Sequence, residues 1–249
     1  MEILVCVKRV PDTETRIRIG DGGRSIDPSG VKYVLSPYDE FAVEAALRTK
    51  EGLGEGEVTV TTFGDDASQE TLRSALAMGA NRAVLLEGAA TMDGLTTAKV
   101  LATEIEEMDP PLVLLGMKAA DADQQQVGPM LATLLGRPCA TAVAEFEVAD
   151  GKVVCRREVE GGTEVLELDL PAVITVTKGA YEPRYASLKG IMAAKRKPLE
   201  KKPVDVPESA LVVEALEPPP EKAAGRIVGE GPDAVAELVR LLREEARVL

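Results

Sequence analysis

The chain has 249 residues, 45% of them hydrophobic and 29% charged, a composition typical of a soluble protein with one sizeable core. Its 42 acidic and 29 basic residues give a net charge of −13, which disfavours non-specific binding to nucleic acid or to an anionic membrane. Histidine is absent and the three cysteines form no CxxC motif, so metal sites, disulfide frameworks and imidazole-dependent triads are not expected. The chain shows neither a signal peptide nor a run long enough to insert in a membrane, which predicts a cytoplasmic protein.

The first half of the chain alternates between short apolar runs and helical patterns. Strands are expected at residues 3–7, 58–61, 83–86 and 112–115, and a pattern with helical spacing follows each of them. A repeated strand-helix order of this kind places parallel strands in one sheet with helices on both faces. The fold class is therefore predicted to be α/β, with a doubly wound, Rossmann-like parallel sheet.

Helix starts in this half carry recognisable local signals. Ser36 is the expected N-cap of one helix, with Pro37 at its first position and Asp39 closing a capping box. Residues 66–69 resemble a second capped start, and a third helix carries apolar residues at helical spacing from 95 to 105. Capping is favoured over a catalytic role for the aspartates at these junctions.

Beyond about residue 138 the pattern changes to antiparallel strands. Residues 152–159 and 164–170 alternate between apolar and polar side chains and are joined by a Gly-Gly turn, which predicts a hairpin over 152–170. Another apolar strand at 171–176 could close the main sheet. The α/β domain is expected to cover residues 1–198.

Residues 199–249 are expected to form a C-terminal arm. Its prolines, at 203, 207 and 218–220, indicate an extended segment that runs along a surface without building a core. The stretch 233–249 has apolar residues at helical spacing and predicts an amphipathic helix. Such a helix needs a surface to pack on, either in its own domain or in a partner.

The sequence ADADQQQVGP, residues 120–129, follows the strand expected at 112–115. Open α/β sheets bind ligands at this end of their strands. Pro129 must lie near a helix start, which leaves the amides of residues 125–128 free to face an anion, while Asp121 and Asp123 suit ribose hydroxyls. A nucleotide satisfies both halves of the loop. The alternative is that these side chains only cap and solvate the helix, and neither a Walker A motif nor GxGxxG is present.

The stretch 178–202 has eight basic and two acidic residues in an otherwise acidic chain. Leu188, Ile191 and Met192 lie within this positive segment, a mixture that favours transient docking to an acidic partner through charge and a buried apolar anchor. The alternative is a short helix that turns these three side chains into the core and leaves its lysines solvated.

Several segments together resemble the beta subunit of electron transfer flavoproteins, in the same order and over nearly the whole chain. No single segment is decisive, but the ordered set is specific. The segments that carry the resemblance are Val5-Cys6-Val7-Lys8-Arg9-Val10, Ser36-Pro37-Tyr38-Asp39, residues 69–80, the loop 120–129, Leu170-Pro171-Ala172-Val173 and residues 182–188.

The resemblance implies a fold of the adenine-nucleotide-binding type and an electron-carrier subunit without catalytic residues of its own. It implies a heterodimer with an alpha subunit that carries the redox-active FAD, while the beta subunit holds a structural AMP. Acyl-CoA dehydrogenases or related flavin dehydrogenases would donate electrons, which pass to a membrane quinone oxidoreductase. The compartment would be the cytoplasm, or the mitochondrial matrix for a processed eukaryotic protein, and the arm 199–249 would clasp the alpha subunit.

Carried over by position, the resemblance implies two sets of site residues. The nucleotide pocket would be lined by Cys6, Ser36, Pro37, Tyr38, Asp39, Phe63, Ala119, Ala120, Asp121, Ala122, Asp123, Gln124, Gln125, Gln126, Val127, Gly128, Pro129 and Met130. The docking loop would cover residues 183–197, with Leu188 as its anchor and Tyr185, Ile191, Met192, Lys195 and Arg196 as further contacts.

Two alternatives remain at this point. The Val127-Gly128-Pro129 ending resembles members that hold a second FAD in place of AMP and bifurcate electrons, whereas Ala122 departs from the glycine that those members often have. A stand-alone nucleotide-binding regulator would also fit the α/β half, although a terminal helix without a core of its own counts against it.

Overall fold

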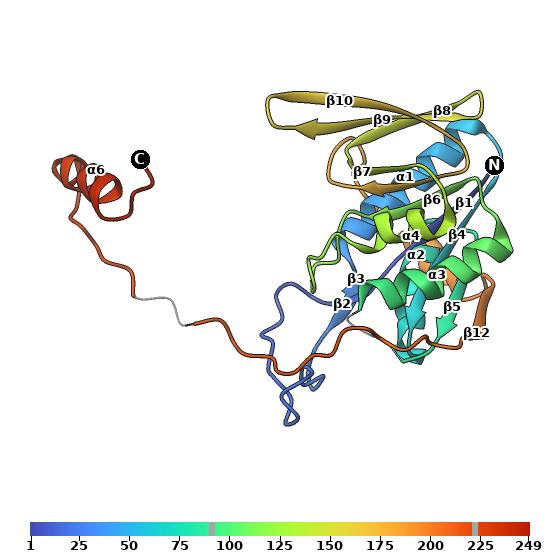
Figure 1. The fold of residues 1–249 in the computed structure, drawn as a ribbon, viewed down its shortest axis with the longest axis horizontal. Coiled ribbons are helices and arrows are strands. Elements are labelled where there is room, and N and C mark those ends of the chain that lie inside the picture. Colours follow the sequence, from blue (N-terminus) through green and yellow to red (C-terminus); the bar gives the residue numbers. More distant parts are fainter. Residues whose placement is uncertain (90–92, 221–223) are drawn as a thin grey trace. The chain divides into compact units, whose positions relative to one another are not determined.

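The computed structural model describes residues 1–89, 93–220 and 224–249 and divides into two compact units, Met1–Ala215 and Leu216–Leu249. The first unit contains all the strands of the described chain (Figure 1). Within the described residues, no helix is both long enough and apolar enough to cross a membrane.

A seven-stranded sheet forms the centre of the first unit, in the order β12-β5-β4-β1-β6-β11-β7, and all neighbouring strands are parallel. Strands β1 and β6 in its middle carry continuous apolar runs, as expected for strands covered by helices on both faces, and Ile3, Leu4 and Val5 are all fully buried. The predicted doubly wound sheet is confirmed. The strands are β1 (Glu2–Cys6), β4 (Glu57–Gly64), β5 (Arg82–Glu87), β6 (Leu112–Gly116), β7 (Cys139–Val143), β11 (Ala172–Val176) and β12 (Leu199–Pro203).

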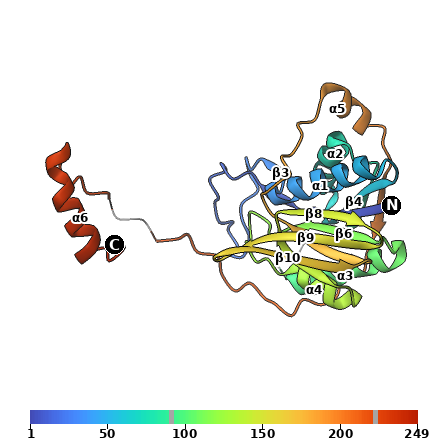
Figure 2. The ribbon, with the colours of Figure 1, turned by 90° about the horizontal axis from the view of Figure 1, so that it is seen from above.

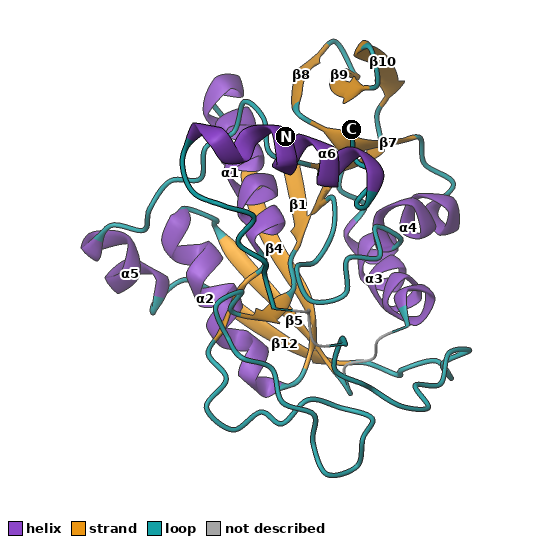
Figure 3. Ribbon diagram, turned by 90° about the vertical axis from the view of Figure 1, so that its left-hand side faces the viewer, coloured by secondary structure: helices purple, strands orange, loops and turns teal. Residues whose placement is uncertain are grey.

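Two helices cover each face of this sheet (Figure 3). Alternate strand residues serve the two layers: Ile3 and Val5 pack beneath α1 and α2, and Leu4 and Cys6 beneath α3 and α4. The helices are α1 (Pro37–Leu53), α2 (Gln69–Met78) after a 3-10 turn at Asp66–Ser68, α3 (Gly94–Met108), α4 (Val127–Leu135) and the short α5 (Leu188–Ala194), which contacts α2 (Figure 2).

A three-stranded antiparallel sheet lies beside β7 and includes the predicted hairpin. The hairpin turn is tighter than expected, because β9 ends at Val159 and β10 already begins at Gly162. Phe146, Val153 and Cys155 join the core beneath it. Its strands are β8 (Glu145–Ala149), β9 (Lys152–Val159) and β10 (Gly162–Asp169), and a separate two-stranded ribbon pairs β2 (Arg9–Pro11) with β3 (Tyr33–Leu35).

The expected capping box at the start of α1 is wrong. Ser36 does occupy the N-cap position, but its side chain makes no cap hydrogen bond, and its hydroxyl is buried without a partner among the described residues. The Asp39 carboxylate instead accepts hydrogen bonds from the backbone amides of Lys8 and Gly116. The expected capped start at residues 66–69 also lacks a side-chain cap, both at the 3-10 turn and at α2.

The division between domain and arm falls later than the expected 198/199. Residues 199–203 form β12, which pairs with β5 and extends the central sheet by one strand. The chain then stays on this unit, since the Ser209 hydroxyl and the Ala210 amide both donate to Asp93 at the start of α3. The boundary between the compact units lies after Ala215.

The second unit consists of extended chain, a 3-10 turn at Pro232–Ala234 and α6 (Val235–Glu244). No residue of α6 is buried, and Val235, Leu238 and Val239 expose at least a third of their surface. The terminal amphipathic helix is confirmed, and the described residues of its own unit leave Val235, Leu238 and Val239 exposed.

Candidate functional site

A pocket opens at the carboxyl ends of β1, β4 and β6, where the chain switches direction in the sheet order. From β1 the chain builds outwards through β4 and β5, and it then returns to the opposite side of β1 as β6. This switch point is where doubly wound sheets leave a crevice between their loops. The lining comes from the ends of these strands, from α3 and from the loop before α4.

Asp39 forms the polar floor of the pocket. One carboxylate oxygen lies 2.7 Å from the amide of Lys8, and the other lies 3.0 Å from the amide of Gly116. Burial raises the pKa of Asp39 to about 7 despite these two donors, which favour the charged form. The carboxyl group thus joins the ends of β1 and β6 to the first turn of α1.

Cys6 lies in the same floor and its side chain is buried. Burial, reinforced by the negative charge of Asp39, raises the pKa of its thiol well above the usual range. A thiol that keeps its proton is a poor nucleophile. Within the described residues, no group of three or more Cys, Asp or Glu side chains is placed to hold a metal ion.

Two lysines bring positive charge to the pocket. Lys8 follows β1 and pairs with Asp121 at 2.7 Å, and Lys118 follows β6 and pairs with Asp123 at 2.7 Å. Both aspartates belong to the loop that was expected to contact ribose, but neither is among the lining residues. Partly exposed pairs of this kind exchange partners at low cost, so both ammonium groups can turn towards an anion.

The loop before α4 bends sharply. Asp123 and Gln125 both have φ of 56°, a left-handed conformation that is uncommon for residues other than glycine. Helix α4 begins at Val127, two residues before Pro129, as predicted. Since the first amides of a helix have no acceptor within it, those of Val127 and Gly128 are available at the pocket wall.

Ten of the predicted nucleotide-site residues line this one pocket: Cys6, Asp39, Phe63, Ala119, Ala122, Gln124, Gln125, Gln126, Val127 and Gly128. Eight do not: Ser36, Pro37, Tyr38, Ala120, Asp121, Asp123, Pro129 and Met130. The sequence reasoning missed Lys8, Lys118 and the small residues Gly94, Thr97 and Gly116. Lys8, Gly116 and Lys118 lie at the carboxyl ends of predicted strands, a signal that could have found them.

The predicted docking segment forms a second surface, around α5. The helix of the alternative interpretation is present, but it packs on α2 through its small residues. Ala194 is buried, and a Cβ added to Gly190 would lie 2.6 Å from the carbonyl oxygen of Ala77. The apolar side chains therefore face outwards, with Leu188 83% and Met192 69% exposed. Of the remaining predicted contacts, Tyr185 is 99% exposed, Ile191, Lys195 and Arg196 are exposed too, and Tyr185, Ile191 and Lys195 line a groove beside α2.

Comparison with known proteins identifies the family of this chain. The model of the electron transfer flavoprotein domain matches residues 24–207, a range that contains the loop before α4 and helix α5. The chain belongs to the electron transfer flavoprotein family. Within this family, the subunit beta of Bradyrhizobium diazoefficiens is 42% identical over the full length of both chains, and that of Bacillus subtilis is 38% identical, also over full length. The subunit beta of Homo sapiens is 40% identical over 98% of each chain.

Proposed function

We propose that this chain is the AMP-binding beta subunit of a heterodimeric electron transfer flavoprotein. Its role is to support an alpha subunit that binds the redox-active FAD and to dock the flavin dehydrogenases, such as acyl-CoA dehydrogenases, that reduce it. Electrons then pass to a membrane quinone oxidoreductase. The observation that carries the proposal is the pocket at the switch point, where two lysines, the first amides of α4 and an apolar wall converge in a chain of this family.

The residues of the pocket fit an adenine nucleotide. Phe63, Leu101 and Leu115 offer an apolar wall for the base. Lys8, Lys118 and the amides at the start of α4 offer positive charge and donors for a phosphate. The role proposed for the bound nucleotide is structural, in a chain that belongs to the electron transfer flavoprotein family.

The alpha subunit is proposed to cover the apolar face of α6. A helix with no buried residue gains little from packing within its own compact unit, and an isolated short helix is marginal in water. A partner that buries Val235, Leu238 and Val239 would supply the missing hydrophobic stabilisation.

The surface around α5 is proposed to dock the dehydrogenase. Leu188 offers an exposed anchor, and Lys189, Lys195 and Arg196 give its surroundings a positive charge in a chain of net charge −13. Local charge of this kind orients an acidic partner before the apolar contact is made.

Cofactor analysis tests the proposal. The chain is co-expressed with its alpha subunit, the complex is purified, and the nucleotides released by acid are separated and quantified. One FAD and one AMP per heterodimer support the proposal, whereas two FAD would show that the pocket holds a second flavin. A stable lone monomer that hydrolyses ATP would exclude both arrangements.

Docking is tested separately with Leu188→Ala in the purified heterodimer. We expect slower reduction by an acyl-CoA dehydrogenase with unchanged FAD and AMP content, because truncation removes the anchor and leaves the pocket intact. A matched control is Val165→Ala, which truncates another exposed apolar side chain on β10. Equal reduction kinetics for wild type and Leu188→Ala would exclude α5 as the docking element.

A further inference from the structure

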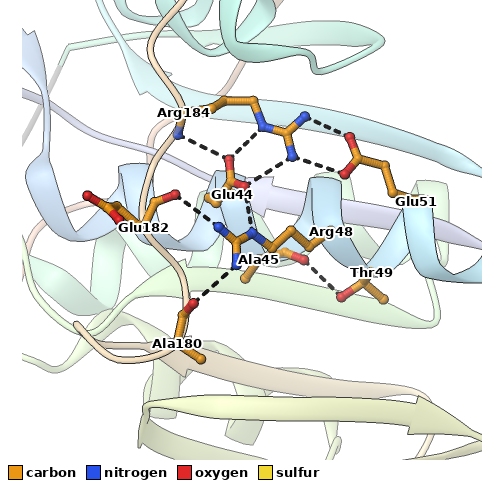
Figure 4. A network of polar contacts seen from close by, with 8 residues as sticks. All are labelled: Glu44, Ala45, Arg48, Thr49, Glu51, Ala180, Glu182 and Arg184. Carbon is orange, nitrogen blue, oxygen red and sulfur yellow. Dashed lines mark hydrogen bonds and ion pairs between the residues drawn. The ribbon is translucent and has the colours of Figure 1, made fainter.

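The segment that leads into α5, residues 178–187, is neither strand nor helix, yet it is fixed to α1 by charged groups (Figure 4). The Arg184 guanidinium donates to both oxygens of Glu44, at 2.7 and 3.0 Å, and to both oxygens of Glu51, at 2.6 and 3.1 Å. Its backbone amide also donates to Glu44, at 3.2 Å. Arg184 therefore connects this segment to two turns of α1 through five hydrogen bonds.

A second arginine uses the same glutamate. Arg48, one turn after Glu44 on α1, donates to Glu44 at 2.8 Å and to the carbonyl oxygens of Ala180 and Glu182 (Figure 4). Glu44 is only 2% exposed. Burial alone would raise its pKa, but the hydrogen bonds from Arg184 and Arg48 lower it below the ordinary value, so Glu44 stays charged.

The far end of α5 is also fixed by an arginine. Arg73 on α2 donates from one nitrogen to the carbonyl oxygens of Ala194 and Lys197, at 2.5 and 2.8 Å. At the near end, the Ser187 hydroxyl accepts from the amide of Gly190 and caps the helix. Helix α5 is thus held at both ends, while Leu188 and Met192 between them remain exposed.

These contacts keep the exposed helix α5 ordered. An exposed seven-residue helix has too few internal hydrogen bonds to keep its shape alone. An anchor that is mobile before binding must lose conformational entropy on docking, which weakens the complex. Ionic hydrogen bonds can order the segment without covering the apolar side chains that the partner needs.

We propose that Glu44, Arg184 and Glu51 form a clamp that holds the segment before α5 in its docking conformation, so that they are positioning residues for electron transfer. This inference rests on the proposed docking function of α5. The clamp residues need not touch the dehydrogenase, since they act through the placement of Leu188, four residues after Arg184.

The test uses the FAD-loaded heterodimer and an acyl-CoA dehydrogenase as electron donor. Arg184→Lys keeps the positive charge but removes the planar fork that reaches both carboxylates. We expect the KM for the heterodimer to rise about tenfold with little change in kcat or cofactor content. Hydrogen exchange of residues 185–196 should become faster. Arg157→Lys, which alters an arginine paired with Glu164 on the outlying hairpin, is the matched control and should behave as wild type.

A second, milder substitution carries less risk that the variant misfolds. Glu51 is 54% exposed, so Glu51→Gln removes one half of the clamp without leaving a buried charge. It should raise the KM in the same direction as Arg184→Lys, but less. In the Leu188→Ala background neither substitution should raise the KM further, because the anchor that the clamp positions is already lost.

The outcomes separate the clamp from docking itself. If Leu188→Ala raises the KM but both clamp variants leave the KM and the exchange unchanged, the clamp is overturned and docking stands. If Leu188→Ala has no effect either, the proposed docking function fails. If the clamp substitutions raised the KM equally in the wild-type and Leu188→Ala backgrounds, the inference would also be overturned. The clamp would then act independently of the Leu188 anchor.

Discussion

Asp39 and Gly116 are in direct contact at the floor of the pocket. The amide of Gly116 donates to the Asp39 carboxylate at 3.0 Å, and a Cβ added to Gly116 would lie 2.4 Å from the same carboxylate oxygen. The same added Cβ would lie only 2.7 Å from the backbone carbonyl carbon of Tyr38. Glycine is therefore required at the end of β6 because α1 begins directly against it.

Gly116→Ala should destabilise the fold and lower the occupancy of the proposed AMP site. The added methyl group meets backbone that cannot move without shifting α1, and such overpacking typically costs about 1–3 kcal/mol. The matched control is Gly52→Ala within α1, where an added Cβ has open space and helix propensity improves by about 1 kcal/mol. Urea unfolding and AMP content measure both effects. A Gly116→Ala protein as stable as wild type would contradict this account of the α1 contact.

The stability of the protein should depend on pH through Asp39. Its pKa is raised to about 7 in the folded state, whereas in the unfolded chain it is about 4. The folded state binds the proton more tightly, so this contribution to the free energy of unfolding is fully present below about pH 4 and is lost as pH rises through 7. Asp39→Asn cannot ionise, and its unfolding free energy should change less between pH 4 and 7. Parallel pH profiles from urea unfolding would contradict the raised pKa.

The central sheet could be predicted from sequence because the apolar pattern of a buried strand lies within a short stretch of chain. A strand covered on both faces is usually rich in apolar residues, and Ile3-Leu4-Val5 and Leu112-Val113-Leu114 are unbroken apolar runs. The alternation of these runs with helical patterns then predicts a parallel sheet with helices on both faces. β12 was not predicted, because Leu199-Glu200-Lys201-Lys202-Pro203 is an edge strand with mostly polar, exposed side chains. It is held in the sheet by its backbone pairing with β5, which leaves no apolar pattern in the sequence.

The orientation of the site residues could not be predicted, because it depends on distant partners. Ser36-Pro37-Tyr38-Asp39 satisfies a local capping pattern, but Asp39 instead binds amides 31 and 77 residues away. Similarly, the sequence of α5 allowed its apolar residues to face inwards or outwards. The outcome is decided by Gly190, whose close approach to Ala77 on α2 turns Leu188 away from the core.

Gly128 has a packing role that the sequence did not reveal. A Cβ added to Gly128 would lie 2.3 Å from the Thr175 methyl group on β11. Gly128→Ala should therefore destabilise the protein by about 1–3 kcal/mol. Adding Thr175→Ser should restore most of the loss, because serine removes the methyl group and keeps the hydroxyl that accepts from the amide of Ala142. Unfolding of the single and double variants tests this, and a double variant no better than Gly128→Ala would contradict it.

Lys8→Met should weaken the proposed binding of AMP without unfolding the protein. Its ion pair with Asp121 is partly exposed and is worth less than about 1 kcal/mol, whereas its charge at the pocket would favour a phosphate. The control is Lys32→Met, which removes a similar ion pair with Asp12 outside the pocket. Calorimetry of the nucleotide-depleted protein should show about tenfold weaker AMP binding for Lys8→Met only, with adenosine binding unchanged. If adenosine binding weakened equally, Lys8 would not act through the phosphate.

Leu238→Ser should impair assembly with the alpha subunit and leave the first unit of this chain intact. Leu238 lies in the second unit and is 43% exposed, so its substitution should spare the first unit but removes an apolar side chain from the face proposed to meet a partner. Glu244→Ser on the same helix is the matched control, because it lowers helix propensity by a similar amount and removes only an exposed pair with Arg240. Analytical ultracentrifugation of the mixed subunits should show a Kd raised about tenfold or more by Leu238→Ser alone. Equal weakening by both variants would attribute the effect to helix propensity, and no weakening by either would show that the alpha subunit does not cover this face.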